Sequence, residues 1–304
     1  MFELFKGLQV DWLGKRKLFI AISMLLLLIG MVSLVLKGRF EYGTDFKGGT
    51  VVVVKFNETV DIGKVRDLLP QADIQTVQSK EGGSEFQIGL AKAVETEDES
   101  VGSEVVTTAL NKGFAGKFRI ESSESVSAKV GADLRRQAVT ATLYALAGIL
   151  IYIAFRFEWI YGAAAVFAVF HDALITLGFF SLFNYEINLT VIAALLTLVG
   201  YSVNDTIVIF DRVRENLKVR RKDDLEVILN DSINQTFSRT ILTSALTFLT
   251  VIALFLFGGE IINNFAFAMV VGIIVGSYSW FPIAAPLVLI YSNLRKPKVA
   301  VNRR

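Results

Sequence analysis

LTVIAALLTLVGYSVNDTIVIF, residues Leu189–Phe210, is an apolar run long enough to cross a lipid bilayer as one helix. One acidic residue, Asp205, lies inside it. A charged side chain at that depth costs roughly 2.5–3.5 kcal/mol on insertion scales, so an acid in such a run marks a candidate functional site. The next apolar run begins near Arg239, which we expect to be the partner of this carboxylate on the adjacent helix.

Five further runs of the same kind accompany this one, and together they predict a multi-pass membrane protein. The first run follows a basic Lys15-Arg16-Lys17 cluster, as a signal peptide would, but it is too long and lacks an Ala-x-Ala cleavage site. We therefore expect an uncleaved anchor. The predicted spans are Leu18–Leu36, Ala138–Phe155, Ile160–Phe183, Leu189–Phe210, Ile241–Phe257 and Phe265–Tyr291.

Composition excludes several classes of site. The net charge of +2 gives no reason to expect a nucleic-acid partner. With no Cys and a single His, the chain cannot form a disulfide, a thiolate metal site or a zinc site of several histidines. The glycine-rich segment Gly43–Thr50 (GTDFKGGT) lacks the spacing of a phosphate-binding loop. We expect no metal, no nucleotide and no other cofactor.

Lys and Arg residues near the span ends predict the orientation in the membrane. Basic residues precede the first span, lie between the second and third, and follow the fourth and sixth, whereas the links 184–188 and 258–264 have none. Arg135 and Arg136, beside the second span, are the exception. Both termini are therefore expected in the cytoplasm, in the sense of the positive-inside rule. The expected cytoplasmic parts are residues 1–17, 211–240 with the approach to the fifth span, and 292–304.

The polar segment 37–137, between the first two spans, is expected on the outer face as an α+β domain. Its alternation of β-branched runs and polar helical runs gives the order β-α-β-β-α-β, which is that of a ferredoxin-like split βαβ fold. A turn is expected at Gly82-Gly83. Expected strands are Thr50–Phe56, Asp73–Lys80, Glu85–Lys92 and Phe118–Ser127, and expected helices are Asp61–Leu69, with Asp61 as N-cap, and Glu95–Phe114.

Three other features concern helix ends and packing. The amphipathic segment 225–237 is expected to lie along the membrane interface before the fifth span. In the sixth span, Gly272 and Gly276 form a small-residue packing signature, and Pro282 and Pro286 predict a kink or an early helix end. The segment DRVREN, residues 211–216, is interpreted as a salt-bridge cluster in which Asp211 and Arg214 stand at i, i+3.

Polar residues on the fourth and fifth spans recur at helical spacing, so each set is expected to form one stripe. Two polar stripes in a membrane bundle should face each other or a wet cavity rather than lipid. His171-Asp172, in the middle of the third span, adds a third polar patch. The stripes are Thr197, Tyr201 and Asp205 with Asn204 flanking, and Gln235, Arg239, Thr243, Thr247 and Thr250.

The polar pairs have a structural and a functional interpretation. Asp205 and Arg239 are either a static ion pair that fixes helix packing or a protonatable pair whose charge state moves the helices. His171-Asp172 is more readily a hydrogen-bonding group that holds the bundle. Asp172 and Asp205 together suggest an intramembrane aspartyl protease, but their sequence contexts match neither motif of that class. We expect no enzyme activity.

Several motifs, in this order, resemble the SecF family, the protein translocase subunits of SecDF complexes in the resistance-nodulation-division superfamily. The resemblance covers nearly the whole chain, and its longest block, GYSVNDTIVIFDRVREN, is specific. The motifs are GTDFKGGT at Gly43–Thr50, VGADL at Val130–Leu134, FRFEW at Phe155–Trp159, HD at His171-Asp172, the block at Gly200–Asn216, and the run around Arg239-Thr240.

The resemblance implies a multi-pass protein of the bacterial cytoplasmic membrane that pairs with SecD. It further implies that the pair works with the SecYEG channel and, indirectly, with SecA on precursor polypeptides, converting proton flow into movement of the outer domain. Asp205 and Arg239 match the proton-relay positions. Supporting polar residues would be Thr197, Tyr201, Asn204, His171, Asp172, Thr243, Thr247 and Asp211.

Two alternatives stay open. A passive scaffold subunit of the translocon would tolerate neutral replacements of the charged pair. A proton-coupled exporter of small molecules is disfavoured, because an outer segment of residues 37–137 is small for an exporter's drug pocket and docking modules.

Overall fold

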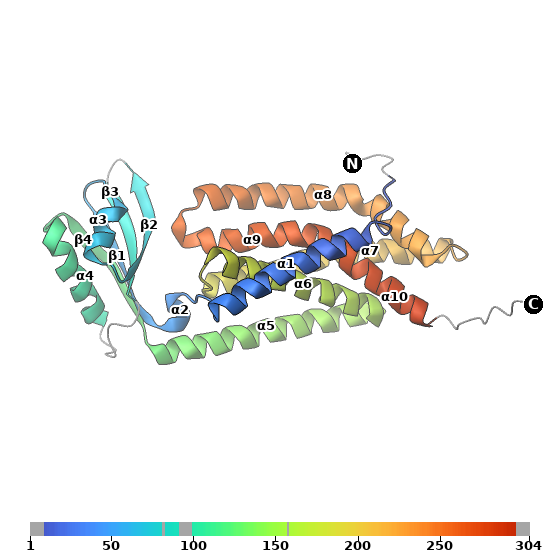
Figure 1. The fold of residues 1–304 in the computed structure, drawn as a ribbon, viewed down its shortest axis with the longest axis horizontal. Coiled ribbons are helices and arrows are strands. Elements are labelled where there is room, and N and C mark those ends of the chain that lie inside the picture. Colours follow the sequence, from blue (N-terminus) through green and yellow to red (C-terminus); the bar gives the residue numbers. More distant parts are fainter. Residues whose placement is uncertain (1–8, 81–82, 91–98, 157, 296–304) are drawn as a thin grey trace, which may run out of the picture.

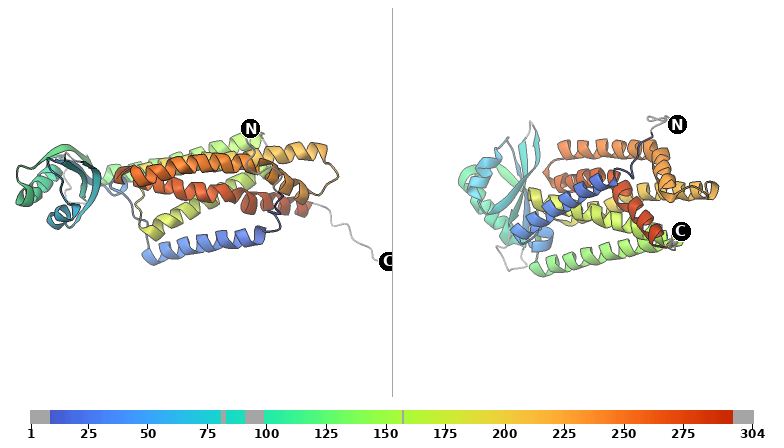
Figure 2. Two further views of the ribbon diagram at one scale, coloured as in Figure 1. Left: turned by 90° about the horizontal axis from the view of Figure 1, so that it is seen from above. Right: turned by 45° about the vertical axis from the view of Figure 1, so that its right-hand side comes forward.

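The computed structural model describes residues 9–80, 83–90, 99–156 and 158–295. Long helices lie side by side in one bundle, and a small sheet domain stands beyond one end of it (Figures 1 and 2). Six of the helical segments in the described part are long and apolar enough to cross a membrane. The bundle consists of α1 (Arg16–Lys37), α5 (Ala128–Arg156), α6 (Trp159–Phe183), α7 (Leu189–Val219), α8 (Leu225–Phe257), α9 (Glu260–Ser279), the π-helical turn η1 (Trp280–Ala284) and α10 (Ala285–Arg295).

Several helices continue beyond the apolar runs from which they were predicted. Hydropathy marks only the apolar part, whereas the backbone hydrogen bonds of a helix continue through polar residues. Helices α7 and α8 therefore extend together past the apolar part as a hairpin, in which the Asn216 amide donates to Ser232 Oγ at 2.8 Å. Arg220 closes the hairpin through Asp231 at 2.6 Å. The predicted interfacial helix 225–237 is thus helical but is the first part of α8, not a separate element.

The sheet domain contains α2 (Thr44–Lys47), β1 (Gly49–Phe56), α3 (Ile62–Leu68), β2 (Ala72–Lys80), β3 (Gly83–Leu90), α4 (Glu99–Phe114) and β4 (Phe118–Val126). All neighbouring strands are antiparallel, in the order β2-β3-β1-β4. From β1 onward the elements follow the predicted order β-α-β-β-α-β. The expected turn at Gly82 and the expected beginning of the second helix lie outside the described residues.

Alternate residues of β1 form the core of this domain. Val52, Val54 and Phe56 are fully buried, because the pleat directs every second side chain to one face. Val65 of α3 and Val106 of α4 cover that face. Asp61 stands at the N-cap of α3 as expected, but its side chain makes no capping hydrogen bond.

The domain is attached to the bundle where the chain leaves α1. Tyr42 pairs with Ile187 in the α6–α7 link as an isolated bridge, and the Gly43 N–H donates to the Ile187 carbonyl at 2.9 Å. Gly48 and Gly49 then turn the chain with φ of 77° and 145°, values that favour glycine. Gly131 at the start of α5 packs on this turn: a Cβ there would lie 3.0 Å from the Phe46 carbonyl oxygen.

Glycines bring the bundle helices into close contact. A Cβ on Gly30 of α1 would lie 2.6 Å from the Cα of Gly178 on α6. A Cβ on Gly272 of α9 would meet the Leu198 side chain of α7 at 2.2 Å, and Gly276 lies against Ser202. The predicted packing role of the two α9 glycines is confirmed.

The last span bends at Pro282. This proline lies inside η1, a single wider π-helical turn at which the helix changes direction before α10 (Figure 1). The predicted kink is confirmed, and the helix does not end early, because α10 continues to Arg295.

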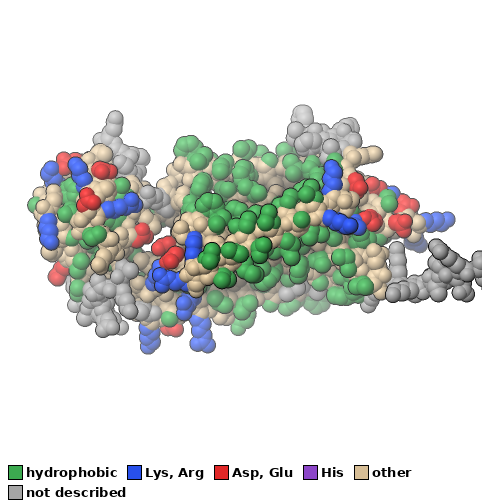
Figure 3. Space-filling view, viewed as in Figure 1, with side chains coloured by type: hydrophobic (Ala, Val, Ile, Leu, Met, Phe, Trp, Pro, Cys, Tyr) green, Lys and Arg blue, Asp and Glu red, His purple; other side chains and the backbone are tan. Residues whose placement is uncertain are grey.

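The surface separates into zones. Hydrophobic side chains cover the middle of the bundle, and charged side chains gather at its two ends and on the sheet domain (Figure 3). Exposed apolar residues such as Leu36, Leu143 and Phe257 belong to the helical part and suit contact with lipid. The start of α1 and the end of α10 both lie at the end opposite the sheet domain (Figure 1).

Candidate functional site

Asp205 lies inside the bundle, between α7 and α8. Only 3% of its surface is exposed. Its Oδ2 atom accepts a hydrogen bond of 3.1 Å from Ser244 Oγ on α8. Ser244 was not among the residues predicted from sequence, although a small hydroxyl residue in an apolar run was the available signal. A carboxylate held this deeply by one hydroxyl is a group whose charge the bundle tolerates poorly.

Arg239 does not contact Asp205. Among the described residues, the ion pairs within 4.0 Å do not include this one, and Arg239 is exposed. Its side chain lines an open cavity of about 310 Å³ together with Asp211, Arg156 and Tyr152. The predicted direct contact is therefore not present in this conformation.

The face of α8 that points into the bundle is one residue away from the predicted face. The buried polar stripe of α8 contains Thr240 and Ser244, exposed by 1% and 4%, and continues back to Ser232 and Thr236. Successive helix positions are about 100° apart, so the predicted stripe through Arg239 stands beside the buried one. Its members are exposed or half-buried: Gln235, Arg239, Thr243, Thr247 and Thr250.

The predicted stripe on α7 winds from the outside to the inside of the bundle. Residues four apart differ by about 40° around a helix, so two such steps turn the stripe by about 80°. Thr197 is accordingly exposed, Tyr201 is half-buried and Asp205 is buried. Asn204 lies on the exposed side. The Tyr201 hydroxyl is buried without a hydrogen-bond partner in the described structure.

His171 and Asp172 form a second polar group that joins three helices. His171 Nδ1 lies 2.9 Å from Asp172 Oδ1 on α6. Asp172 Oδ2 accepts from Ser202 Oγ of α7 at 2.6 Å and from Ser279 Oγ at the end of α9 at 2.8 Å. Both residues of the pair are 5% exposed. The arrangement supports the structural interpretation, and the two serines are residues that sequence reasoning missed.

This second group has room at its edge. A cavity of about 10 Å³ touches Asp172, Ser202 and Thr176, which is roughly the space of one water molecule. The Nε2 atom of His171 is buried without a hydrogen-bond partner in the described structure. On its other side, the His171 ring meets Tyr278 edge-on, and the Tyr278 hydroxyl lies 3.1 Å from Ser23 Oγ of α1.

The charged cluster at the end of the fourth span is arranged differently from the prediction. Asp211 pairs with Arg156 of α5 at 3.7 Å rather than with Arg214. Arg212 donates to Gln235 of α8 at 2.5 Å and pairs with its neighbour Glu215. Contacts between helices thus replace the expected contact within one helix. Among the described residues, no three His, Asp or Glu side chains lie together in a way that could hold a metal ion.

Comparison with known families decides the identity. The family model described as "Protein export membrane protein SecD/SecF, C-terminal" matches residues 105–294, well over half of the chain. The model of the SecD/SecF GG motif matches residues 35–60, which contain the turn at Gly48 and Gly49. The chain belongs to the SecF family of protein translocase subunits.

Relatives of this SecF-family chain are similar over their whole length. The protein translocase subunit SecF of Calditerrivibrio nitroreducens is 45% identical over 292 residues, covering 95% of this chain and 96% of the relative. SecF of Koribacter versatilis is 37% identical over 380 residues, covering 96% and 94%. These relatives are named as subunits of a translocase, which is a transport role.

Solved SecDF structures have the same fold. SecDF from Thermus thermophilus, a translocon-associated membrane protein, superimposes with a TM-score of 0.79 at 36% identity over 96% of this SecF-family chain. SecDF in a super-membrane-facing form gives 0.73 at 36% identity over 97%. The chain spans 40% of the length of each of these SecDF chains.

Proposed function

We propose that the chain is the SecF half of a SecDF-type complex that uses the proton-motive force to promote protein export. The complex would lie in the bacterial cytoplasmic membrane and act with the SecYEG channel, and indirectly with SecA, on precursor polypeptides. In this proposal Asp205 takes up and releases the proton. Arg239 is the positive charge whose attraction to Asp205 changes when the carboxylate gains or loses that proton. The observation that carries the proposal is the position of Asp205 on α7, because the far end of α7 is bonded to the sheet domain.

An uncovered polar face supports pairing with a second membrane subunit. On α7, Thr197, Gly200 and Asn204 are exposed, and on α8 Arg239 and Thr243 are exposed in the same way. Polar side chains at membrane depth rarely face lipid. SecD is the occupant that we propose for this face, in line with the single-chain SecDF proteins of which this chain spans 40%.

Movement would pass from the proton site to the sheet domain along α7. Asp205 is in the middle of this helix, and Leu189 at its first turn donates its N–H to Asp45 of the sheet-domain connection at 2.9 Å. A charge moved through the membrane potential supplies about 2.3 kcal/mol per 100 mV. Thr197, Tyr201, Asn204, Thr243 and Thr247 would line the route, and Asp211, His171 and Asp172 would support the helices that carry it.

We also propose the orientation and the class of the sheet domain. The strand order β2-β3-β1-β4 with two covering helices is the arrangement expected of a ferredoxin-like fold. The domain would be extracytoplasmic, between the first two spans. Both termini would be cytoplasmic, because the start of α1 and the end of α10 share the end of the bundle near which most of the basic clusters stand.

The test replaces Asp205 by Asn, which keeps the size of the side chain and its ability to accept the hydrogen bond from Ser244. Export of a precursor into membrane vesicles is measured with and without a proton gradient, at matched amounts of the SecD pair. We expect D205N to lose the gradient-dependent part of export and to keep the rest. Asp224→Asn is the matched control and should retain the stimulation, because this exposed residue before α8 makes no side-chain capping hydrogen bond. Full stimulation in D205N would overturn the proton role.

A charge exchange distinguishes the proton role from the passive scaffold. Asp205→Arg combined with Arg239→Asp keeps the charges but moves the carboxylate to the exposed side of α8. We expect the exchanged variant to pair with SecD as the unaltered chain does but to lack gradient-dependent export. A scaffold would give normal export in D205N, because it needs only the packing, which the Asn side chain keeps.

A further inference from the structure

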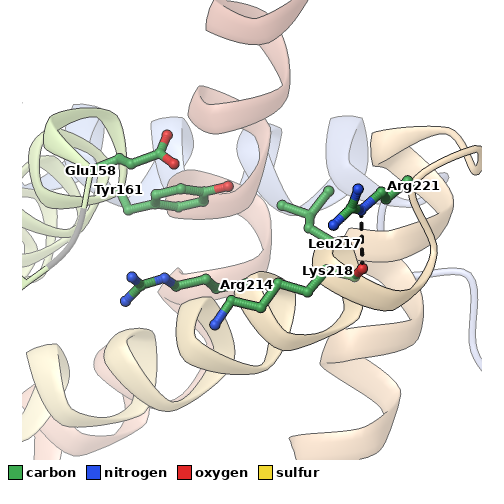
Figure 4. Close-up of a pocket in the computed structure, with 6 residues that line it drawn as sticks. All are labelled: Glu158, Tyr161, Arg214, Leu217, Lys218 and Arg221. Atoms are coloured by element: carbon green, nitrogen blue, oxygen red, sulfur yellow. Dashed lines mark hydrogen bonds between the residues drawn. The ribbon is translucent and has the colours of Figure 1, made fainter.

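A basic pocket lies at the end of the bundle opposite the sheet domain, apart from both polar groups described above. It is an open pocket of about 300 Å³ between the start of α6 and the end of α7. Figure 4 shows the lining residues, with the Tyr161 hydroxyl directed toward α7 and the long side chains of Arg214 and Lys218 extending toward α6. The lining residues are Glu158, Tyr161, Arg214, Leu217, Lys218 and Arg221.

The helix spacing explains why the basic residues converge. Arg214, Leu217 and Lys218 follow i, i+3, i+4, so they share one face in the last turns of α7. Arg221 is held over that end by the hydrogen bond from its Nε to the Lys218 carbonyl at 3.4 Å. The Tyr161 ring is fixed from behind by Phe210, with ring centroids 5.0 Å apart.

The pocket has a surplus of positive charge. It contains three basic side chains and one acidic side chain, so its net charge is 3 − 1 = +2. Among the described residues, neither Arg214 nor Lys218 has an ion-pair partner within 4.0 Å, although Arg212, Arg220 and others nearby do. Glu158 therefore leaves two positive charges uncompensated, which favours an anion in the pocket.

The surroundings of the pocket are those of a membrane boundary. Trp159, the first residue of α6, is 56% exposed, and its ring meets Tyr291 at 4.9 Å between centroids. Aromatic side chains of this kind are common at the level of lipid headgroups. Val219, next to the basic turn, is 85% exposed. A ligand in the pocket itself would meet the basic groups together with the Leu217 side chain and the Tyr161 ring.

We infer that this pocket binds the phosphate group of an anionic phospholipid. Arg and Lys donors suit phosphate, and the Tyr161 hydroxyl adds a neutral donor. Basic pockets between membrane helices are a known way of recognising anionic headgroups. A free phosphate ion shares the charge but gains nothing from the apolar Leu217 side chain and Tyr161 ring that line the pocket, so we favour the lipid. The inference does not depend on the proposed proton role.

The test uses the full-length chain in detergent and counts bound lipid by native mass spectrometry. Phosphatidylglycerol is titrated against phosphatidylcholine, and a separate arm adds inorganic phosphate as competitor. The double variant R214Q/K218Q removes two charges from the pocket. The matched control K15Q/K17Q removes two exposed charges at the start of α1, at the same end of the bundle. Arg221→Gln serves as a second pocket variant if the double variant fails to fold.

We expect the chain to retain phosphatidylglycerol in preference to phosphatidylcholine. The double variant should weaken that binding by at least about tenfold, as loss of charged hydrogen bonds predicts, and R221Q by a smaller factor. The control should change it by less than about twofold. Equal binding by pocket and control variants would overturn the site, and so would equal binding of both lipids. Full displacement by inorganic phosphate at similar concentration would overturn the lipid as its source.

Discussion

The Asp45 carboxylate accepts a hydrogen bond of 2.9 Å from the backbone N–H of Leu189, the first residue of α7. The first N–H groups of a helix have no partner inside the helix, and a negative charge there is favourable. The Asn188 side chain also caps this helix, because its Oδ1 atom accepts a hydrogen bond of 3.0 Å from the Val191 N–H. Asp45 belongs to α2, which leads directly into the sheet domain. The helix that carries Asp205 is therefore fastened to the domain at its first turn.

Asp45→Ala is expected to uncouple the domain from the bundle. Loss of a capping carboxylate costs about 1 kcal/mol locally, too little to prevent assembly. Gradient-dependent export should fall while SecD pairing persists, measured in the vesicle assay. Asp45→Asn should retain part of the activity, because its amide oxygen still accepts. Asp61→Ala is the control, since that side chain makes no capping bond. Equal export by D45A and D61A would refute the coupling.

Ser244→Ala is expected to destabilise the chain by about 1 kcal/mol, measured by denaturant unfolding in detergent. The variant removes the hydroxyl that donates to Asp205 and leaves the buried carboxylate without it. Thr243→Ala is the matched control. The Thr243 hydroxyl is exposed and donates only to carbonyls of its own helix, at 3.1 Å and 2.9 Å, so its loss should stay within about 0.5 kcal/mol. Equal losses would show that the Asp205 bond contributes nothing.

Asp172→Ala is expected to be more damaging, at about 3 kcal/mol, because the hydroxyls of Ser202 and Ser279 and the His171 ring all lose an acceptor. Asp172→Asn should be milder, since its amide oxygen still accepts one of these bonds. Ser279→Ala removes one bond only and should cost about 1 kcal/mol. If D172N unfolds normally but abolishes gradient-dependent export, His171-Asp172 has a functional rather than a structural role.

Glu186, in the link between α6 and α7, is expected to make the domain attachment sensitive to pH. Burial, together with the nearby charge of Asp73, raises the pKa of this carboxyl above its usual value of 4.5. The folded state then holds the proton more tightly than the unfolded state. The contribution of Glu186 to stability therefore falls as the pH rises from the usual pKa of 4.5 through the raised pKa. Above the raised pKa the destabilisation is complete.

Glu186→Gln should therefore raise the melting temperature at about pH 7.5 more than at about pH 4.5, which flattens the pH profile. Glu41→Gln is a control with the opposite sign, because a hydrogen bond from Lys47 lowers the pKa of Glu41. Losing that carboxylate should lower the melting temperature mainly at the higher pH. A parallel pH profile for E186Q and the unaltered chain would contradict the role given to Glu186.

The sequence predicted six long apolar helices, because a bilayer sets the minimum length of an apolar run that can cross it. The strands of the domain were also predictable, since β1 alternates strictly between buried and half-buried positions. The face of α8 was not. Thr243 and Ser244 are adjacent, both are hydroxyl residues, and each belongs to a polar stripe with i+4 spacing. Only the contact with Asp205 shows which of the two faces inward.

Contacts between residues that are distant in the chain could not be predicted from the sequence either. Gly30 and Gly178 are each ordinary within their own helices, and nothing in the sequence pairs them. Ser202 and Ser279 carry no signal of their shared acceptor, Asp172. The missing contact of Arg239 has another origin, because its side chain lies on a face that we propose is covered only in the pair with SecD.

The meeting of Gly30 and Gly178 bears on how the protein is made. During synthesis the first span emerges long before the third, so α1 must wait in the membrane as a lone anchor. The whole sheet domain is produced meanwhile, between α1 and α5. Where α1 finally joins α6, the contact leaves no space for one methyl group, so a lipid chain cannot remain between them. Assembly of the bundle therefore requires lipid to leave the contact between Gly30 and Gly178. Packing of α6 against α1 is the step that displaces this lipid.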